Sequence, residues 1–449
     1  MNKKNIRIVG GGLAGSEAAW QLARRGVECE LWEMRPERGT EAHQTSMLAE
    51  LVCSNSLRDD SEMTAVGVLK RELRAMGSLI MRVADEVRVP AGSALAVDRV
   101  LFAEKITAAI QALPQVTIRR GEVTSIPDDG LTILATGPLT SPALSEELGR
   151  YVGSRHLYFY DAISPILTAE SVDMDVAFRA SRYGRGSDDY VNCPMDREQY
   201  EKFVADILAA ETMPLKSFER CIYFEGCMPI EEMARRGRDT LAFGPMKPVG
   251  LENPRTGRRA HAVVQLRQDD VEGRLLSMVG FQTKMTYPEQ RRIFRTIPGL
   301  ERAEFVRLGS LHRNTYIDSP ASLTPLLALR ARPDVMVAGQ LVGVEGYVES
   351  TATGLLAGMY AAALARGQQP IAPPPTTAVG SLIAYVTDPQ RRDFQPMNAN
   401  YGLFPPLPRR LHGRDKKEAL SRRAAVDLDA WMAAVEADFS PAACAAGPI

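Results

Sequence analysis

The sequence predicts an α/β protein in which a mixed α+β insertion domain interrupts a Rossmann-like nucleotide-binding domain. Two observations carry this prediction. Residues 6–33 read as a strand, a tight glycine turn, a helix and a second strand, which is the start of a parallel βαβ unit. Residues 334–365 return to a buried strand, a glycine-rich connection and a helix of small residues. A chain of 449 residues is also too long for one compact core.

The elements between these two segments follow from local patterns. Apolar residues at helical spacing predict helices at 63–76 and 98–113, and β runs follow at 116–120 and 131–137. Ser141-Pro142 is typical of a helix start, and Asp196 with Gln199 fits a capping box. The strand-like runs AVVQLRQ and LLSMVGFQTKM flank a turn near Gly273. We therefore expect four segments: 1–170, first part of the nucleotide-binding domain; 171–308, insertion; 309–370, return; and 371–449, a proline-rich linker with a basic final segment.

Composition is that of a soluble globular enzyme, with 45% hydrophobic and 24% charged residues. The longest uncharged runs are shorter than a membrane span, and the N-terminal apolar stretch is too short and glycine-rich for a signal peptide. Six cysteines without a C-x-x-C pair suit reduced thiols. We expect a cytoplasmic protein that uses no membrane and no metal, since no cysteine or histidine set has zinc spacing.

Charge is distributed unevenly although the formal net charge is −1. Residues 235–318 hold 16 Lys or Arg against 9 Asp or Glu, and residues 405–425 hold 7 against 2. Clustered arginine on a neutral protein is what a polyanion-binding face would look like. A solvated surface in an arginine-rich protein explains the same counts equally well.

The residues of the glycine turn predict a dinucleotide site. Gly10-Gly11-Gly12-Leu13-Ala14-Gly15 fits G-x-G-x-x-G, and Glu33 stands 18 residues after Gly15 at a strand end, followed by Met34 and Arg35. The glycines allow a tight turn, close approach of a pyrophosphate and close packing of helix on strand, while the glutamate can accept hydrogen bonds from a ribose.

The glycine turn alone leaves FAD, NAD and S-adenosylmethionine as candidate ligands. Two later strand ends favour FAD. They are Ala135-Thr136-Gly137 and Ala338-Gly339-Gln340, and both resemble the strand ends that contact the flavin in two-dinucleotide-fold flavoproteins. A methyltransferase that uses S-adenosylmethionine has no need of the second one.

Several stretches together resemble the family of folate- and FAD-dependent tRNA (uracil-5-)-methyltransferases, TrmFO. They run in order from Ile6 to about Arg410: GGGLAGSEAAWQLARRG, ELVCSNSLR, VPAGSALAVDR, FEGCMPIEEMARRG, FGPMKPVGL, VVQLRQ, FQTKMTYPEQRRIFRTIPGLE, HRNTYI and AGQLVGVEGYVESTATGLLAG. The chain departs from the expected pattern at Gln44, where a second histidine is expected, and at Asp318, where an amide is expected.

The resemblance implies methylation of carbon 5 of the T-loop uridine of tRNA, position 54. A thiolate adds to carbon 6 of the uracil, and carbon 5 then attacks a one-carbon unit from 5,10-methylenetetrahydrofolate, passed through nitrogen 5 of the reduced flavin. Loss of the carbon 5 proton, release of the thiolate and hydride transfer leave the methyl group. NADPH or NADH reduces the flavin.

The thiols that match the family motifs are Cys53 and Cys227. We predict Cys227, at a Gly-Cys turn, as the nucleophile and Cys53 as the acceptor of the carbon 5 proton, although the two roles could be exchanged. Lys247 and the arginines at 235 and 236 could favour a thiolate. Cys53 could also be a buried core cysteine.

The resemblance also implies where folate and tRNA bind. HRNTYI offers His312, Arg313 and Asn314, and Tyr347 lies in the later glycine-rich loop, so we expect the pterin there, with His312 or Tyr347 against its face. The uridine must be extruded from the folded tRNA. The arginine-rich insertion and the segment 409–423 are then the candidates for contact with phosphates.

Three alternatives remain open at this point. One is a flavoprotein that modifies the wobble uridine, as in the related glucose-inhibited division protein A family. Another is a flavin-dependent thiol oxidoreductase, which would want two cysteines a few residues apart, whereas Cys221 and Cys227 are six apart. The last is an FAD-stabilised RNA-binding protein without turnover.

Overall fold

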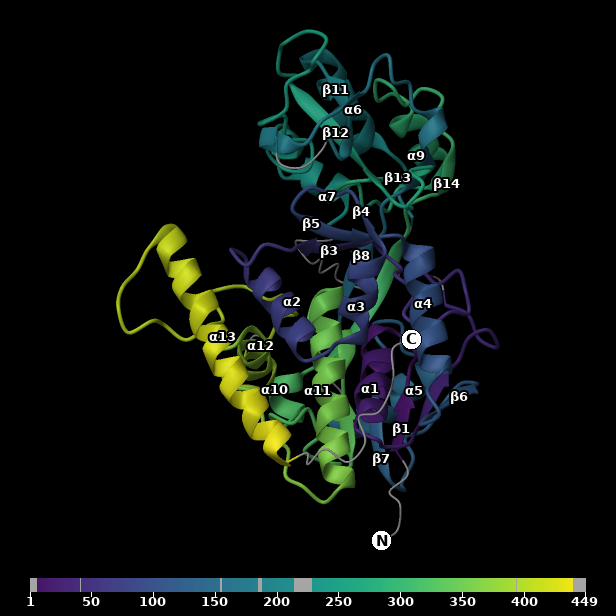
Figure 1. Cartoon of the computed structure of the whole chain (residues 1–449). Coiled ribbons are helices and arrows are strands. Elements are labelled where there is room, and N and C mark those ends of the chain that lie inside the picture. Colours follow the sequence, from purple (N-terminus) through teal and green to yellow (C-terminus); the bar gives the residue numbers. More distant parts are fainter. Residues whose placement is uncertain are drawn as a thin grey trace.

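The computed structural model describes residues 6–40, 42–153, 156–184, 188–213, 228–392 and 394–438, and the side chains at 156–162, 311–313 and 437–438 are not among those described. The chain forms two lobes (Figure 1). The larger lobe holds the first and the last described residues, 6 and 438, and the parallel sheet of the predicted nucleotide-binding domain. The smaller lobe is built from the middle of the sequence.

The larger lobe is organised around a five-stranded parallel sheet with the order β16-β7-β1-β2-β6. Its strands are β1 (Ile6–Val9), β2 (Cys29–Glu33), β6 (Val116–Arg120), β7 (Leu131–Leu134) and β16 (Val335–Val337). β1 lies between β2 and β7. Along the chain, β2 and β6 are added on one side of β1, and β7 and β16 are then added on the other. The carboxyl ends of the strands at such a switch point form the usual ligand crevice of an open α/β sheet.

Helices α1 (Leu13–Arg24) and α11 (Tyr347–Ala365) pack closely beside this sheet. Glycines make the close approach possible. A Cβ at Gly354 would lie 2.2 Å from the carbonyl oxygen of Ala14, and one at Gly358 would lie 2.6 Å from that of Ala18. The small residues that we noted in the sequence of α11 therefore serve helix–helix contact.

The remaining helices of the larger lobe surround this pair. They are α2 (Ala65–Ala75), α3 (Leu79–Glu86), α4 (Arg99–Gln111), α5 (Pro142–Val152), α10 (Ser319–Ser322), α12 (Ala378–Thr387), α13 (Gly413–Asp438) and the 3₁₀ helix η4 (Gly339–Val342). The predicted helices at 63–76 and 98–113 are confirmed as α2 and α4, and Ser141 caps α5 with Pro142 at its start, as predicted.

The smaller lobe has its own six-stranded sheet and its own hydrophobic core. The strand order is β10-β11-β12-β13-β9-β14, with antiparallel pairs throughout. The elements are β9 (Ile166–Thr168), β10 (Phe178–Arg179), β11 (Tyr190–Met195), β12 (Ala262–Gln268), β13 (Leu275–Met278), β14 (Phe305–Arg307), α6 (Arg197–Ala209), α7 (Ile230–Arg235), α8 (Thr240–Phe243), α9 (Tyr287–Phe294), and the 3₁₀ helices Ala169–Ser171 and Arg182–Gly184. The capping box of Asp196 and Gln199 is confirmed.

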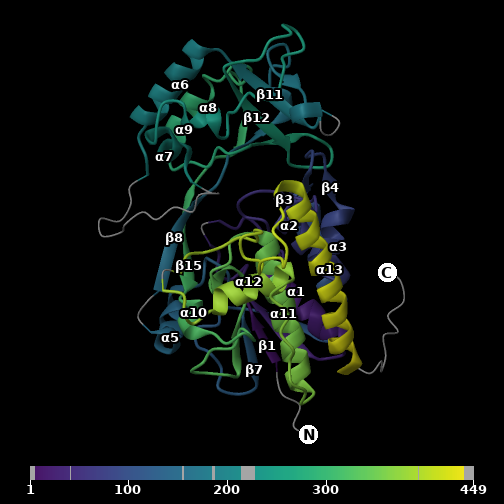
Figure 2. The ribbon, with the colours of Figure 1, turned by 90° about the vertical axis from the view of Figure 1, so that its left-hand side faces the viewer.

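Two small sheets lie where the lobes meet. A ribbon of β8 (His156–Ala162) and β15 (Leu311–Ile317) connects the lobes, as Figure 2 shows. The second is the sheet of β3 (Ser56–Asp59), β5 (Ala94–Val97) and β4 (Arg88–Val89). The domain limits at 170 and 308 stay a prediction. The first residue of the hydrophobic core of the smaller lobe is Leu167.

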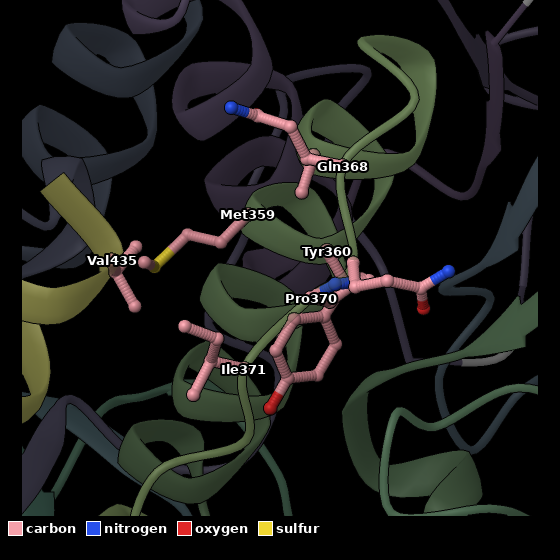
Figure 3. A pocket seen from close by; sticks show the side chains of 8 residues that line it. Met359, Tyr360, Gln368, Pro370, Ile371 and Val435 are labelled. Carbon is pink, nitrogen blue, oxygen red and sulfur yellow. The ribbon is translucent and has the colours of Figure 1, made fainter. Parts of the chain in front are cut away.

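The C-terminal segment, predicted as a proline-rich linker with a basic final part, packs onto the larger lobe with two helices, α12 and α13. Both oxygens of the buried Glu72 in α2 accept the N–H groups of Ala378 (2.7 Å) and Val379 (2.8 Å) at the start of α12. Helix α13 runs along α2 (Figure 1). Figure 3 shows a pocket of about 310 Å³ between α11, the loop 368–371 and α13, with mostly apolar walls.

The Tyr360→Phe change is expected to raise the free energy of unfolding by about 1 kcal/mol. Tyr360 lines the pocket of Figure 3, is 2% exposed, and its hydroxyl has no hydrogen-bond partner among the described residues. The matched control is Tyr200→Phe, since Tyr200 donates to the carbonyl of Arg238 (2.7 Å) and accepts from the N–H of Ala242 (3.2 Å). Thermal unfolding should show a gain for Tyr360→Phe and a loss for Tyr200→Phe, and a loss in both would contradict this account.

Candidate functional site

The glycine turn after β1 has the geometry that the sequence predicts for a dinucleotide site. Gly10 has a φ of +106°, and a Cβ there would lie 2.4 Å from the carbonyl oxygen of Ala135. A Cβ at Gly15 would lie 1.8 Å from the carbonyl oxygen of Gly10. A Cβ at Gly12 would meet nothing within 4 Å. The fold thus requires glycine at positions 10 and 15, whereas Gly12 leaves an open space beside the turn.

The first turn of α1 is suited to hold an anion. Gly12 is its N-cap residue and no side chain caps the helix. The first N–H groups of a helix lack partners within the helix, and the helix dipole favours negative charge at that end. A pyrophosphate in the space next to Gly12 would accept from the backbone around Leu13 and Ala14.

Glu33 ends β2 beside the turn, and its carboxylate binds protein donors. Oε2 accepts from the N–H of Gly11 (3.0 Å) and from Arg35 Nη2 (3.2 Å), and Oε1 accepts from Arg35 N (3.0 Å) and Nε (2.9 Å). Burial raises the pKa of Glu33, but the hydrogen bonds and charge of Arg35 outweigh it and the pKa lies below its usual range. These four bonds match the acceptor capacity of a carboxylate. A bond from Glu33 to a ribose stays a prediction.

Two pockets share Leu139, and the first of them contains Gly10 of the glycine turn, so together they make an elongated site suited to a dinucleotide. The first encloses about 350 Å³. Its walls come from the ends of β1, β2 and β7 and from the residues after β6: Val9, Gly10, Trp32, Met34, Gly121, Glu122, Val123, Thr136, Leu139, Thr140, Ser141 and Leu144. Met34 and Thr136, predicted as cofactor residues, therefore lie in it.

The second pocket lies where the two lobes meet and encloses about 1070 Å³, open solvent included. Its walls are Ala42, Val52, Cys53, Ser54, Ser56, Leu57, Arg58, Pro138, Leu139, Ile163, Gln282, Asn314, Gln340, Glu345, Gly346, Tyr347, Val348 and Asn398. Four of the predicted site residues meet here, namely Cys53, Asn314, Gln340 and Tyr347. The FAD expected from the sequence would have its adenosine end in the first pocket and its flavin end in the second, and this placement stays a prediction.

The Cys53 thiol is half-buried in a loop held by Tyr347. Tyr347 is the first residue of α11, and its Oη accepts from the N–H of Cys53 (2.8 Å) and of Ser54 (3.2 Å). Burial raises the pKa of Tyr347, so the phenol stays neutral. The guanidinium groups of Arg99, Arg267 and Arg307 each interact electrostatically with Cys53. An anion is therefore favoured in this part of the pocket.

Amide side chains bring further polar groups to the second pocket. Asn314 is 3% exposed, and its Nδ2 has no hydrogen-bond partner among the described residues. Such a donor at a pocket wall is suited to a carbonyl or ring nitrogen of a ligand. Gln340 Nε2 donates to Glu345 Oε2 (3.1 Å) and the N–H of Gly339 donates to Thr353 Oγ1 (2.8 Å), which fix the loop before α11.

Other predicted site residues lie elsewhere. Cys227 and the side chains of His312 and Arg313 are outside the described part of the structure. Lys247 is exposed on the smaller lobe and does not line the pocket of Cys53. Arg235 pairs with Glu232 (2.5 Å).

The structure adds an ion pair that the sequence patterns did not single out. Arg58 lines the second pocket and pairs with the buried Glu349 of α11, which also accepts from the N–H of Ala399 (2.8 Å). Beneath it, Lys70 donates to the carbonyls of Arg58 (3.1 Å) and Asp59 (2.5 Å), and burial lowers its pKa to about 8. Arg58 belongs to the ELVCSNSLR stretch, so its place in a family motif is the signal by which the sequence could have indicated it.

Two features are absent from the described residues, namely a helix that could cross a membrane and a cluster of side chains that could bind a metal ion. No described helix combines the length and apolar character needed to cross a membrane. No group of three or more His, Cys, Asp or Glu side chains in the described ranges could hold a metal ion.

Comparison with known proteins identifies the family. The profile of the family described as "Glucose inhibited division protein A" matches residues 5–369. The methylenetetrahydrofolate--tRNA-(uracil-5-)-methyltransferase TrmFO of Geobacter sulfurreducens is 58% identical over 431 residues, which cover 96% of this chain and 99% of that protein. The chain belongs to the TrmFO family. The TrmFO of Moorella thermoacetica is 57% identical over 95% of this chain and 97% of that protein.

Solved structures agree with this family at the level of the fold. Aquifex aeolicus GidA in its form II crystal has a TM-score of 0.68 and 16% identity, covering 98% of this chain and 74% of that chain. Its form I crystal gives a TM-score of 0.67. The predicted Rossmann-like fold with an insertion is confirmed, and membership of the TrmFO family confirms the resemblance seen in the sequence.

Proposed function

We propose that this member of the TrmFO family methylates carbon 5 of a tRNA uridine, at position 54 of the T-loop, and takes the carbon from 5,10-methylenetetrahydrofolate. The observation that carries the proposal is the second pocket. It brings the half-buried Cys53 together with Asn314, Gln340 and Tyr347, and it shares Leu139 with the pocket of the glycine turn, in a chain 58% identical to the TrmFO of Geobacter sulfurreducens. Bound FAD, reduced by NADPH or NADH, supplies the electrons for the methyl group.

The two thiols divide the work on the uracil. Cys227 forms a C–S bond to carbon 6, and the electron pair of the 5,6 double bond then attacks the one-carbon unit from carbon 5. Cys53, as a thiolate, accepts the proton that leaves carbon 5, and the C–N bond between the one-carbon unit and its carrier breaks, which leaves an exocyclic methylene on carbon 5. A hydride from the reduced cofactor adds to this methylene, and the C–S bond breaks to return Cys227 as a thiolate.

The folate lies against the flavin end of the site in this proposal. Asn314 offers its Nδ2 to the pterin, while His312 and Arg313, its neighbours on β15, are proposed to contact the same molecule. Tyr347 holds the Cys53 loop and borders the same pocket.

The tRNA is proposed to bind across exposed cations of both lobes. In the smaller lobe the proposed contacts are the exposed cations between residues 235 and 259, namely Arg235, Arg236, Arg238, Lys247, Arg255, Arg258 and Arg259. In the segment 409–423 most cations are exposed, but Arg423 donates to the carbonyls of Pro405 (2.6 Å) and Pro406 (3.1 Å) and holds the proline-rich loop. Because the proposed substrate is tRNA, we propose that the protein acts in the cytoplasm.

The proposal is tested by incubating the purified protein and unmodified tRNA with NADPH and 5,10-methylenetetrahydrofolate and measuring 5-methyluridine by nucleoside mass spectrometry. We expect product with the folate and none with S-adenosylmethionine in its place. The Cys227→Ala variant should lose the product and keep its FAD. A tRNA with cytidine at position 54 should receive no methyl group.

The outcomes separate the alternatives. A modified wobble uridine with an unmodified position 54 would replace the proposed substrate by that of the division protein A family. Tight tRNA binding without product from either donor would reject the methyltransferase and favour an RNA-binding flavoprotein.

A further inference from the structure

The Cys53 loop lies between the two lobes and is bonded to both. On the larger lobe, Tyr347 accepts from the N–H groups of Cys53 and Ser54. On the smaller lobe, β12 provides Arg267 and Gln268, more than 200 residues away in the sequence. The loop that carries one proposed catalytic thiol is therefore also a contact between the lobes.

The contact to β12 consists of interlocking hydrogen bonds. Arg267 donates from Nε to Asn55 Oδ1 (3.0 Å) and from Nη2 to Ser54 Oγ (2.9 Å). Asn55 in turn donates from Nδ2 to the carbonyls of Gln268 (2.9 Å) and Val97 (3.0 Å). Asn55 is 0% and Arg267 8% exposed. The two residues that follow Cys53 are thus fixed in direction and distance relative to β12.

A contribution to the stability of the fold does not by itself explain why the guanidinium of Arg267 is buried here. The side chain of Arg267 has neutral hydrogen-bond partners here, and the nearby carboxylate of Asp269 is already paired with Arg99 (2.8 Å). Burial lowers the pKa of Arg267, because a guanidinium loses hydration at this place. A buried charge of this kind costs free energy that an apolar pair of similar volume would not.

We propose that Arg267 and Asn55 are positioning residues that hold the thiol of Cys53 at a fixed place relative to the smaller lobe. The inference rests on the proposed function, because the smaller lobe's sequence carries Cys227, and the two thiols act on adjacent atoms of one uracil ring. A displacement of about 1 Å in such an arrangement can cost about 10²-fold in rate. Arg267 and Asn55 touch neither uracil nor cofactor in this scheme.

The test compares Arg267→Gln and Arg267→Lys with a matched control, Arg182→Gln. Arg182 donates to Gln265 Oε1 (2.9 Å) and to the carbonyl of Val249 (3.0 Å), so it has neutral partners as Arg267 does, but all of them belong to the smaller lobe. For Arg267→Gln we expect kcat for 5-methyluridine formation to fall about 10- to 100-fold. KM for tRNA, FAD content and the rate of flavin reduction by NADPH should stay as in the parent protein. The kcat of Arg267→Lys should lie between those of the parent protein and of Arg267→Gln, and Arg182→Gln should keep the kcat of the parent protein.

Hydrogen–deuterium exchange on the same variants tests the positioning without any turnover. In Arg267→Gln the amides of residues 51–57 should exchange about 10-fold faster, while those of the five-stranded sheet do not change. Unchanged exchange in 51–57, an unchanged kcat, or loss of FAD in parallel with kcat would overturn the inference. A parent protein that makes no 5-methyluridine would reject the proposed function, and the exchange result would still decide the positioning.

Discussion

The Cys53→Ala variant is expected to form 5-methyluridine about 10²- to 10⁴-fold more slowly than the parent protein, the usual range for loss of a general acid or base. It should bind FAD and accept electrons from NADPH at the parent rate. The reason is the separation of tasks in the site. Cys53 lines the pocket at the junction of the lobes, whereas the glycine turn and α1 form the other end of the dinucleotide site. The measurements are single-turnover methylation and stopped-flow flavin reduction.

The matched control is Cys29→Ala. Cys29 begins β2, is 5% exposed, and burial with the charge of Glu30 raises its pKa to about 12. It is a neutral thiol at physiological pH, so its replacement should cost stability and leave the rate constant of methylation unchanged. An equal loss of rate in both variants would show that Cys53→Ala acts through the fold.

The same variant decides which thiol is the nucleophile. A tRNA carrying 5-fluorouridine at position 54 traps the adduct at carbon 6, because fluorine cannot leave as a proton does. If Cys53 takes the carbon 5 proton, Cys53→Ala still forms the covalent protein–tRNA complex and Cys227→Ala does not. The reverse result would exchange the two roles. A denaturing gel distinguishes the outcomes.

The parts of the fold that the sequence predicted are those decided by neighbours along the chain. Strand β1, helix α1 and strand β2 have the expected limits, since a glycine turn, an apolar period and a strand end are local signals. Beyond the turn near Gly273, however, only 275–278 of the predicted strand is β13. The residues after it leave the sheet at Gly280, which has a φ of +75°, and Lys284 and Thr283 then bond to Glu232 and Glu231 of α7.

The site shows the same division between local and distant signals. Gly10, Gly12 and Gly15 could be assigned roles from one motif, and the structure gives each the expected surroundings. The bond from Cys53 to Tyr347 spans 294 positions in the sequence, and that from Asn55 to Arg267 spans 212. No period or turn signal reports a contact over such separations. The assembly of Cys53, Asn314, Gln340 and Tyr347 in one pocket therefore needed the structure.

The Gly12→Ala variant is expected to bind FAD about 5- to 150-fold more weakly, and the folded protein should persist. A Cβ at Gly12 meets no protein atom within 4 Å, and Gly12 has a φ of −73°, which alanine adopts without strain. The added methyl group would project into the space that the pyrophosphate needs. Overpacking by one methyl group costs about 1–3 kcal/mol, which corresponds to this range of affinity at 1.4 kcal/mol per tenfold.

Gly15→Ala is the contrasting variant, because its added methyl group meets the protein itself. The Cβ would lie 1.8 Å from the carbonyl oxygen of Gly10, and a backbone atom cannot turn aside as a flexible side chain can. Gly15→Ala should therefore lower the thermal stability of the FAD-free protein, whereas Gly12→Ala should leave it within about 1 kcal/mol. Fluorescence titration with FAD and thermal unfolding of the FAD-free proteins check the pair. Unchanged affinity in Gly12→Ala would place the pyrophosphate away from the start of α1 and remove the glycine turn from the cofactor site.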